Sequence, residues 1–434
     1  MGHASANQDL RLQATADATS PVVIIGAGVV GLSTALYLLR TGRNVIVIDP
    51  LPPPGGASFG NAGMISADTS VPIALPGMLR KVPSWLTDPL GPLAVRPSYL
   101  PRALPWLARW IAAGRMPRVL KISDAMRALH RNAFLCWQEL LGAQHFSELV
   151  RQTGQVHVWE TDQETEGAVL DRRLRERHGI PSQILSQGDL RTMFPGISSA
   201  VRRGVLIPGN GYTISPQRLV RTLHRLFVDE GGRVLPEVVM KIIPRAEGSA
   251  YDLMTNVGVH RCRQIVVAAG AHSVRLLKPL GIHVPLETER GYHVMLPEAN
   301  VSFATAVSNK TRSCGITPMA DGLRVAGTVE IAGLEAAPDE RRAQALLTNI
   351  RAMFPDVNIE GHRFWMGFRP STPDSLPILG EVVGRPGLFL AVGHGHFGMT
   401  GGPPSGELVA DLVNGATPKL DPSAYSPLRF SLFA

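Results

Sequence analysis

Cysteine is scarce in this chain, which has only three in 434 residues. The three, Cys136, Cys262 and Cys314, stand alone, and no C-x-x-C spacing joins them. An odd number of isolated cysteines argues against a disulfide framework and gives no zinc motif, so we expect no metal. This cysteine usage favours a reducing, cytoplasmic location.

Lysine is also rare, with 6 lysines against 37 arginines in a chain of net charge +8. The basic residues are spread along the sequence, and their tightest group, within residues 171–177, alternates with acidic residues. Such alternation is typical of a solvated helix face rather than a phosphate-binding patch. We therefore predict no nucleic-acid partner.

The chain lacks a long uninterrupted hydrophobic run. Residues 1–20 are polar and contain no apolar core, so we expect a flexible N-terminal tail rather than a signal peptide. Residues 22–39 are mostly apolar, but three glycines, a central Ser-Thr pair and the missing basic flank argue against a membrane span. A hydrophobic content of 44% indicates a globular protein with one or two domains.

Residues 22–49 have the organisation of a dinucleotide-binding unit. A β-branched run is followed by Gly26, Gly28 and Gly31 in G-x-G-x-x-G spacing, then by a helical segment, a second strand and Asp49. The first glycine permits a tight turn, the second a close approach of pyrophosphate, and the third close helix–strand packing. The helix N-terminus favours phosphate, and the acid at the end of the second strand can accept hydrogen bonds from a ribose.

Two segments after this unit are rich in glycine or proline. Residues 50–66 (PLPPPGGASFGNAGMIS) allow the backbone to pass close to a ligand, although composition alone favours a plain loop. Residues 71–114 contain eight prolines with Trp85, Trp106 and Trp110, and Leu100–Ala113 is predicted to form an amphipathic helix. That helix either lies at a membrane interface or covers the active site, and we favour the cover.

The rest of the chain shows both periodicities. We predict one helix over residues 122–142 and a solvated helix face around 171–177. We also predict a helix and strand over 216–235, followed by 238–243 as a further layer of a parallel sheet. Residues 264–270 and 388–392 are predicted to be buried strands, and a terminal helix is predicted over 406–412. Alternating segments at 292–296, 322–326 and 363–368 indicate an antiparallel sheet with a helix over 339–353 beside it.

Three separated pieces resemble the D-amino-acid oxidase-type flavoproteins: residues 26–49, QIVVAAGAHS, and GFRPSTPDSLPILG with LAVGHGHFGMTGGPPSG. SFGNAGMIS and PLETERGYHV look most like the D-amino-acid dehydrogenase branch, including its D-proline and D-hydroxyproline dehydrogenases, and the resemblance spans residues 21–412. It implies an α/β (α+β overall) fold, with a Rossmann-like FAD-binding domain interleaved with an antiparallel-sheet substrate domain. The implied FAD domain is discontinuous (21–70, 209–280 and 370–425), and the substrate domain takes 71–208 and 281–369.

The resemblance also implies FAD, held without a covalent bond because no cysteine stands near Gly367. The turn after residue 394 would offer backbone N–H groups to the flavin edge that gains negative charge on reduction. The implied cofactor-binding residues are Gly26, Gly28, Val29, Val30, Gly31, Asp49, Pro50, Ser58, Asn61, Ala62, Gly63, Met64, Val239, Ala269, Gly270, Gly395, His396, Phe397, Gly398, Met399 and Thr400.

An amino-acid substrate needs a carboxylate ligand, and arginine provides a planar, bidentate one. By resemblance Arg369 is the first candidate, with Arg290 and Arg324 as second choices. Tyr292 and His293 are candidates for bonding the carboxylate or the amino group, with a purely structural role as the equal alternative. No acid–base residue is obligatory if the amine binds in its neutral form.

The resemblance thus implies FAD-dependent dehydrogenation of D-amino acids by hydride transfer from the α-carbon, with D-proline or D-hydroxyproline as candidate substrates. The implied partners are a small D-amino acid and a quinone or other electron acceptor, reached through peripheral contact with the inner face of the cytoplasmic membrane. The alternatives are a glycine- or sarcosine-type oxidase that releases hydrogen peroxide, and a flavoprotein subunit without catalytic activity.

Overall fold

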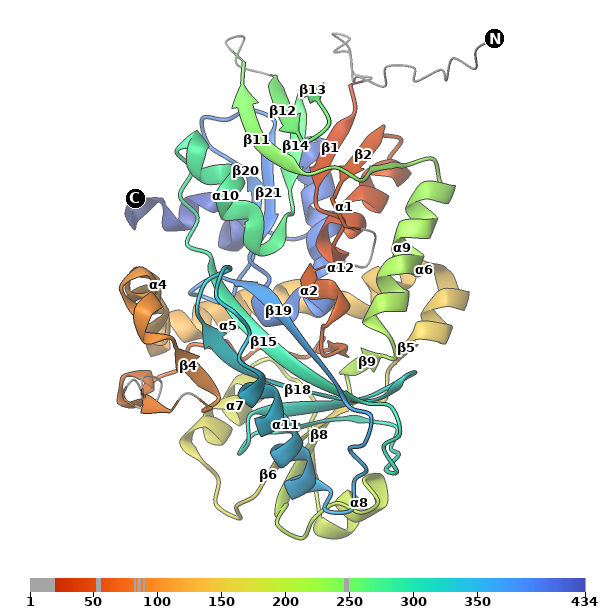
Figure 1. Cartoon of the computed structure of the whole chain (residues 1–434), viewed down its shortest axis with the longest axis vertical. Helices are drawn as coiled ribbons and strands as arrows, with labels where there is room; N and C mark the ends of the chain where they lie inside the picture. The colour runs from red at the N-terminus through yellow and green to blue at the C-terminus, as the bar shows by residue number, and fades with distance from the viewer. Residues whose placement is uncertain are drawn as a thin grey trace.

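The structure is a computed structural model that describes residues 20–51, 56–81, 83, 87, 88, 90–245 and 250–433. Residues 1–19 of the predicted tail and Trp85 lie outside these residues. A six-stranded sheet occupies the upper half of the view in Figure 1 and a nine-stranded sheet the lower half.

The six-stranded sheet has the order β10-β2-β1-β14-β21-β20. Its first five strands are parallel, and β20 runs antiparallel to β21. The strands are β10 (Arg233–Leu235), β2 (Val45–Ile48), β1 (Val22–Ile25), β14 (Gln264–Val267), β21 (Leu388–Val392) and β20 (Ile378–Glu381). They come from three ranges of the chain that fall inside the three segments predicted for the FAD domain, whose exact limits remain a prediction.

Both faces of this sheet are covered, which explains its unbroken Val/Ile runs. Val22 and Ile24 pack toward α1 (Val29–Arg40), α9 (Pro216–Asp229) and α12 (Gly398–Val413). Val23 and Ile25 pack toward the opposite face, formed by α10 (Ser273–Leu277) and a small sheet of β11 (Val239–Pro244), β12 (Tyr251–Thr255) and β13 (Val259–Cys262).

Residues 238–243 do not extend the parallel sheet, so that prediction is wrong. β11 pairs antiparallel with β12, and β12 with β13. The two strands that follow in the chain give β11 local antiparallel partners, whereas a parallel partner would need another crossover. The preceding strand was predicted correctly, because β10 is parallel to β2.

The nine-stranded sheet has the order β19-β15-β18-β17-β16-β6-β8-β7, and β4 pairs with β18. Its strands are β19 (Arg363–Ser371), β15 (Glu287–Leu296), β18 (Gly322–Ile331), β17 (Cys314–Met319), β16 (Ala306–Asn309), β6 (Gln155–Trp159), β8 (Arg203–Ile207), β7 (Gln183–Leu185) and β4 (Leu93–Val95). The antiparallel core β19-β15-β18-β17 confirms the sheet predicted from alternating residues.

The two faces of β15 have different surroundings. Tyr292, Val294 and Leu296 pack in one core with α11 (Glu340–Met353). Successive side chains of a strand point to opposite faces, so Glu289, Gly291 and His293 lie on the face turned toward the six-stranded sheet. This alternation of side chains decides which charged residues of β15 point into the space between the two sheets.

The predicted helix over 122–142 is two helices, α5 (Met116–His130) and α6 (Ala133–Leu149). Asn132, between them, has a non-helical backbone at φ −98° and ψ 10°. Both helices bury their inner faces in the same core, so the apolar stripe continues across the break. The hydrophobic periodicity alone therefore does not reveal where the first helix ends. The terminal helix also begins earlier than predicted, at Gly398, despite Pro403 and Pro404.

Helix α4 (Leu100–Ala113) has the predicted bounds, and its tryptophans point inward. Trp106 and Trp110 are 5% and 4% exposed and stack with ring centroids 5.8 Å apart. The Trp106 Nε1–H donates to the Ser371 carbonyl at 3.1 Å. The helix α4 therefore covers the interior with its aromatic side. No helix in the described part of the chain is long and apolar enough to cross a bilayer.

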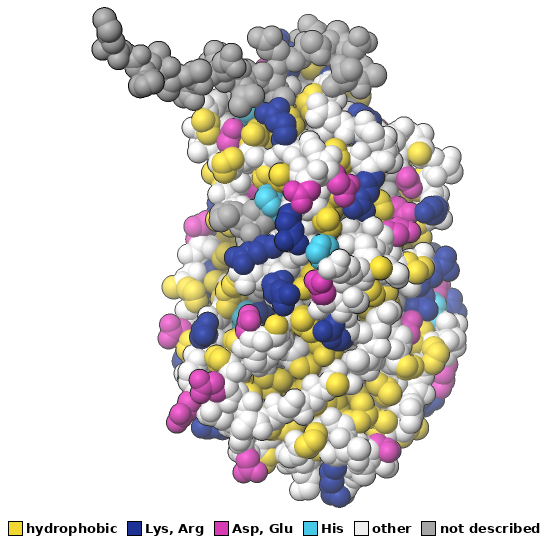
Figure 2. All heavy atoms as spheres, turned by 90° about the vertical axis from the view of Figure 1, so that its right-hand side faces the viewer, with side chains coloured by type: hydrophobic (Ala, Val, Ile, Leu, Met, Phe, Trp, Pro, Cys, Tyr) yellow, Lys and Arg dark blue, Asp and Glu magenta, His cyan; other side chains and the backbone are white. Residues whose placement is uncertain are grey.

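On the face of the molecule drawn in Figure 2, lysine and arginine side chains are interspersed with acidic ones. Helix α7 (Glu166–Arg177) carries the arginine-rich group, and three of its arginines pair with acidic neighbours. Arg175 is an exception to the predicted solvated face, because it is only 4% exposed and pairs with Asp171 at 3.3 Å.

Candidate functional site

A cavity of about 720 Å³ lies where the carboxyl ends of β1, β2, β14 and β21 meet β15 and β19. Parallel α/β sheets characteristically bind ligands at this edge, beyond the carboxyl ends of their strands. The wall is built from the β1–α1 turn, residues 56–62, residues 268–276, the β15 and β19 strands, and residues 391–399.

The three glycines of the N-terminal motif have distinct positions. Gly26 has φ +116°, a left-handed conformation that L side chains rarely adopt, and a Cβ there would lie 2.4 Å from the Ala268 carbonyl oxygen. A Cβ on Gly31 would lie 1.9 Å from the Gly26 carbonyl oxygen, so this glycine allows α1 to pack against the turn. Gly28 borders the cavity, and among the described residues only the Ser58 hydroxyl, at 3.3 Å, is near its missing Cβ.

Asp49 and Ser58 hold the turn from the cavity side. The Asp49 carboxylate accepts from the Ala27 N–H at 2.7 Å and from the Leu51 N–H at 2.8 Å. A carboxylate has about four acceptor positions, so Asp49 retains capacity for ribose hydroxyls. Ser58 Oγ accepts from the Val29 N–H at 3.1 Å, which fixes the 56–62 loop against the first turn of α1.

All predicted cofactor residues line the cavity except Gly31, Gly63, Met64, Phe397 and Thr400. Gly63 lies against Met319, and Met64 Sδ lies 2.9 Å from the Gln155 side-chain nitrogen. The Thr400 hydroxyl accepts from the Ser66 N–H at 2.9 Å, and the Phe397 ring packs 5.4 Å from that of His130. These residues support the wall from behind.

Arg369 is the predicted carboxylate ligand that the structure brings to the cavity. Its guanidinium lies over Gly291, where a Cβ would be 2.2 Å from Cζ. Among the described residues its hydrogen bonding is a long contact of 3.4 Å to the Thr328 carbonyl, so most of its N–H donors remain open. Burial lowers the pKa of Arg369, and the nearby Glu289 carboxylate opposes that shift.

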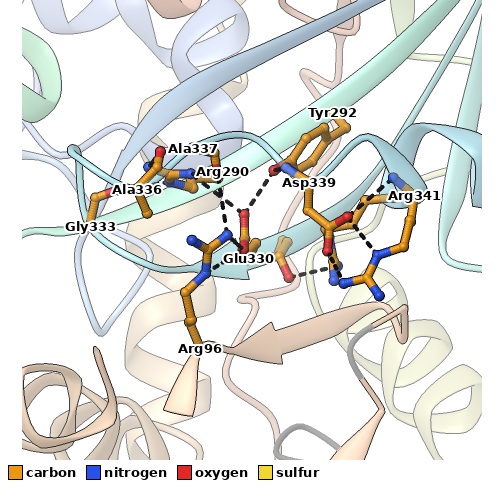
Figure 3. Close-up of polar contacts among 11 residues, drawn as sticks. Arg96, Arg290, Tyr292, Glu330, Gly333, Ala336, Ala337, Asp339 and Arg341 are labelled. Carbon is orange, nitrogen blue, oxygen red and sulfur yellow. Dashed lines mark hydrogen bonds and ion pairs between the residues drawn. The ribbon is translucent and has the colours of Figure 1, made fainter. Parts of the chain in front are cut away.

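Arg290 is not brought to the cavity. It lies on the opposite face of β15, fully buried, and donates to the carbonyls of Gly333, Ala336 and Ala337. Figure 3 shows it beside Glu330, whose carboxylate also accepts from Arg96 and from the Tyr292 hydroxyl. Because its donors are used in this way, Arg290 is a ligand of the 333–337 segment rather than of a substrate.

Tyr292 borders the cavity, but its hydroxyl forms its hydrogen bonds on the face of β15 that carries Arg290. It donates to Glu330 at 2.8 Å and accepts from the Asp339 N–H at 3.0 Å. Burial raises the pKa of Tyr292. The structure therefore gives the hydroxyl a structural use and does not bring it to a ligand.

Arg324 and His293 support the 56–62 loop from outside the cavity. Arg324 Nη1–H donates to the Asn61 carbonyl at 2.6 Å, and His293 Nδ1 lies 3.0 Å from the Gly60 carbonyl oxygen. Burial lowers the pKa of Arg324 to about 10 and that of His293 to about 3. The neutral His293 ring stacks on Trp365 with centroids 5.0 Å apart.

Several residues of the cavity wall were missed from the sequence. Trp365 and Gly367 precede Arg369 by four and two residues, and the strand period of two would have placed them on its face. Gly291 and His394 lie next to predicted residues. His272 stands in the QIVVAAGAHS motif, two residues after the predicted Gly270, whereas Arg275 of α10 carried no sequence signal.

The arrangement fits FAD. The β1–α1 turn and Gly28 leave a cradle that a Cβ would fill, Asp49 has acceptor capacity for a ribose, and Val239 and Ala269 add apolar wall nearby. At the other end, Gly395 and Gly398 border the cavity next to the first turn of α12, where helix N–H groups favour negative charge. Bound FAD would supply hydride-transfer chemistry to this end.

Comparison with known proteins supports this fit. The model of the family described as FAD dependent oxidoreductase matches residues 21–412. D-amino-acid oxidase of Bradyrhizobium diazoefficiens is 37% identical over 94% of this chain and 98% of its own length. D-amino acid dehydrogenase of Vibrio cholerae is 31% identical over 92% of this chain and 96% of its own length.

The fold has solved counterparts as well. The crystal structure of L-proline dehydrogenase from P. horikoshii superposes with a TM-score of 0.74 at 18% identity, covering 95% of this chain and 98% of that chain. The same arrangement of a parallel and an antiparallel sheet is thus kept at low identity. With a family match that spans nearly all described residues, the chain belongs to the FAD-dependent oxidoreductase family and is an FAD-dependent enzyme.

Proposed function

We propose that the enzyme oxidises D-amino acids at the α-carbon, with non-covalently bound FAD as the immediate acceptor. The observation that carries the proposal is Arg369, an arginine in the cavity wall whose guanidinium is largely unpaired among the described residues. The names of the relatives at 37% and 31% identity, a D-amino-acid oxidase and a D-amino acid dehydrogenase, point to the same substrate class.

The residues of this chain bind and orient the substrate. Arg369 pairs with the substrate carboxylate through two parallel N–H bonds, which fixes the position of the α-carbon. Trp365 offers apolar wall that excludes water from the reacting carbon. Bound FAD would supply the hydride acceptor for this carbon, and the imine product would hydrolyse in water to a keto acid.

Within this class we propose D-proline or a D-hydroxyproline isomer as the substrate, which rests on the resemblance of SFGNAGMIS and PLETERGYHV to that branch. The alternative is a small amine such as glycine or sarcosine. Anaerobic bleaching of the bound flavin by a panel of D- and L-amino acids, glycine and sarcosine tests both. Faster bleaching by L-amino acids than by their D forms would overturn the stereochemical assignment.

The role of Arg369 is tested by Arg369→Lys. A lysine cannot form the bidentate pair, and loss of a charge-assisted bond of about 1.5–3 kcal/mol raises KM by roughly tenfold or more. Arg290→Lys is the matched control, because it makes the same change on the other face of the paired strand. We expect the control to lower thermal stability and to leave KM unchanged. Equal KM values for Arg369→Lys and the unmodified enzyme would contradict the proposal.

We propose a quinone or another carrier as the second electron acceptor, in line with the dehydrogenase names among the relatives. Oxygen is the alternative, since the relative at 37% identity is named an oxidase. Peroxide release and dye reduction, measured with the same substrate, decide between them. Peroxide formed at the rate of dye reduction would make this enzyme an oxidase.

For access to a quinone we propose peripheral contact with the inner face of the cytoplasmic membrane, near α4. Leu104 of α4 is 53% exposed, although Trp106 and Trp110 are buried and cannot serve as interfacial anchors. Sedimentation with anionic vesicles at low and high salt tests this contact. Protein that stays in the supernatant at low salt would contradict it.

A further inference from the structure

A buried carboxylate, that of Glu289, lies between two basic side chains at the edge of the cavity. Glu289 is 4% exposed, and its Oε2 is 2.6 Å from Nε2 of His396. In the β15–β19 pairing it stands directly opposite Arg369, so both side chains lie on the same face of the sheet. His396 comes from the turn between β21 and α12, more than a hundred residues later in the chain.

The two partners differ in their access to the cavity. His396 lines the large cavity and also a second, small hollow behind it. Glu289 lines only the small hollow, together with Trp110 of the α4 cover. The histidine is therefore the member that faces a ligand, and the carboxylate holds it from behind, which is the arrangement of an oriented base.

The charge of Glu289 decides which hydrogen-bonding role its histidine partner takes. Burial raises the pKa of Glu289, but the hydrogen bond from His396 and the charge of Arg369 act against burial, and the pKa lies below its ordinary value. An ionised carboxylate only accepts hydrogen bonds, so His396 Nε2 carries a hydrogen. The other ring nitrogen, Nδ1, has no hydrogen bond among the described residues.

The two other histidines near His396 are buried and neutral. His394, two residues before it, has its Nε2 2.9 Å from the Ser405 hydroxyl, and His130 approaches from α5. Burial lowers the pKa of His394 to about 3 and that of His130 to about 4, so both rings are neutral. Among the groups around this corner, Arg369 is a cation and Glu289 an anion, and His396 is the imidazole that borders the large cavity.

We propose that His396, positioned by Glu289, removes a proton from the substrate ammonium group before the hydride leaves the α-carbon. This inference rests on the proposed function. The substrate N–H bond breaks, its electron pair stays on nitrogen, and the proton forms a bond to His396 Nδ1. Bound FAD would supply the two-electron acceptor for the hydride of the α-carbon, and the nitrogen lone pair freed by His396 would complete the C=N bond.

The charges favour this order. A zwitterionic substrate has no net charge, and proton transfer inside the site leaves two matched pairs, Arg369 with the carboxylate and protonated His396 with Glu289. No unpaired charge is left in a buried place, where it would be costly.

The first test is binding, which does not depend on turnover. The probe 2-aminoisobutyrate carries both charged groups but no α-hydrogen, and pivalate replaces its ammonium by a methyl group. In FAD-loaded enzyme, we expect His396→Gln to weaken 2-aminoisobutyrate about tenfold and pivalate less than twofold, whereas Arg369→Lys weakens both. The Kd values are read from calorimetry. Equal weakening of the two probes by His396→Gln would overturn the proposal.

The second test follows proton transfer. In His396→Ala we expect kcat/KM at neutral pH to fall at least a hundredfold, added imidazole to restore part of it, and the acid limb of the pH profile to move toward the titration of the free amine. Glu289→Gln should shift the same limb. His260→Gln is the control, because it removes a His–Glu contact of the same 2.6 Å length outside the cavity wall.

The outcomes separate this inference from the proposed function. D-amino acids can bleach the flavin while His396→Ala keeps the pH profile of the unmodified enzyme and is not activated by imidazole. In that case the His396–Glu289 pair has a structural role only, and this inference is wrong while the proposed function still stands. If no D-amino acid bleaches the flavin of the unmodified enzyme and 2-aminoisobutyrate does not bind, the proposed function fails with it.

Discussion

The position of a single guanidinium in this enzyme depends on a glycine. Gly291 lies under Arg369, and a methyl group there would be 2.2 Å from Cζ and from Nη1. The Thr328 carbonyl fixes Arg369 only through a contact of 3.4 Å. Thr328 itself is the extra residue of a bulge in β18, with φ +59°, a costly conformation for a β-branched side chain. The space for Arg369 is thus set by backbone geometry.

We expect Gly291→Ala to displace Arg369 and to raise KM for D-amino acids about tenfold, while the FAD content of the purified enzyme stays unchanged. Steady-state kinetics and flavin absorbance measure the two quantities. Gly258→Ala is the control, since a Cβ at that position meets no atom of the described residues within 4 Å. Unaltered KM in Gly291→Ala would show that Arg369 does not hold the substrate.

At the scale of single elements, the β1–α1 turn is the part most sensitive to substitution. Gly28→Val places a branched side chain between Ser58 and the cavity, where the pyrophosphate is expected. We expect this variant to be purified without flavin, measured as the absorbance ratio at 450 and 280 nm. Gly167→Val, at a glycine with open space around it, should keep its full flavin content. A fully loaded Gly28→Val enzyme would contradict the assignment of the turn.

The segment between β18 and α11 is held by buried charges. Glu330 is 5% exposed and accepts from Arg96 at 2.6 Å and from the Tyr292 hydroxyl at 2.8 Å, with Arg290 at 3.7 Å. Removing its charge leaves a buried guanidinium uncompensated, so we expect Glu330→Gln to lower the free energy of unfolding by about 3 kcal/mol. Urea unfolding measures the change.

The matched control for that prediction is Glu335→Gln. Glu335 pairs with Arg275, but its side chain is 83% exposed, and an exposed ion pair contributes less than about 1 kcal/mol. A smaller loss of stability in Glu330→Gln than in Glu335→Gln would show that the buried pairs do not hold this segment.

For the whole molecule, buried histidines predict sensitivity to acid. Burial lowers the pKa of His130 to about 4, whereas the unfolded chain has the ordinary value near 6.5. Between these two values the unfolded state binds more protons than the folded state, so stability is complete above about pH 6.5 and is lost as the pH falls toward 4. The slope is at most about 1.4 kcal/mol per pH unit for each such histidine.

We expect His130→Asn to flatten this dependence when the free energy of unfolding is measured at pH 7, 6 and 5 in excess FAD. His145→Asn, on α6 beside Glu148, serves as the control and should keep the slope of the unmodified enzyme. An equal slope in all three proteins would assign the acid sensitivity to other groups.

Much of the fold was predictable because its signals are local. The glycine triplet, the flanking strands and Asp49 lie within thirty residues, and their roles follow from backbone sterics and hydrogen bonding in that short range. The bounds of α4 and β21 also agree with the predicted ones, since each has a clear period and a Pro or Gly near its ends. The break at Asn132 was not predictable, because one core buries both helices.

What the sequence by itself determined was the cofactor-binding unit, the alternating strands and the presence of arginines within them. It could not determine which face of β15 and β19 would meet the cavity. That choice was made by α11, which packs on one face of β15 and buries Tyr292, while Arg290 turns to the carbonyls of residues 333–337. Arg369, Gly291 and Glu289 were thereby left on the cavity face, and His396 joined Glu289 only when β21 and α12 packed beside them. The alternation of side chains along a strand follows from the local sequence. Which element packs on each face of the sheet is set by contacts between residues far apart in the chain.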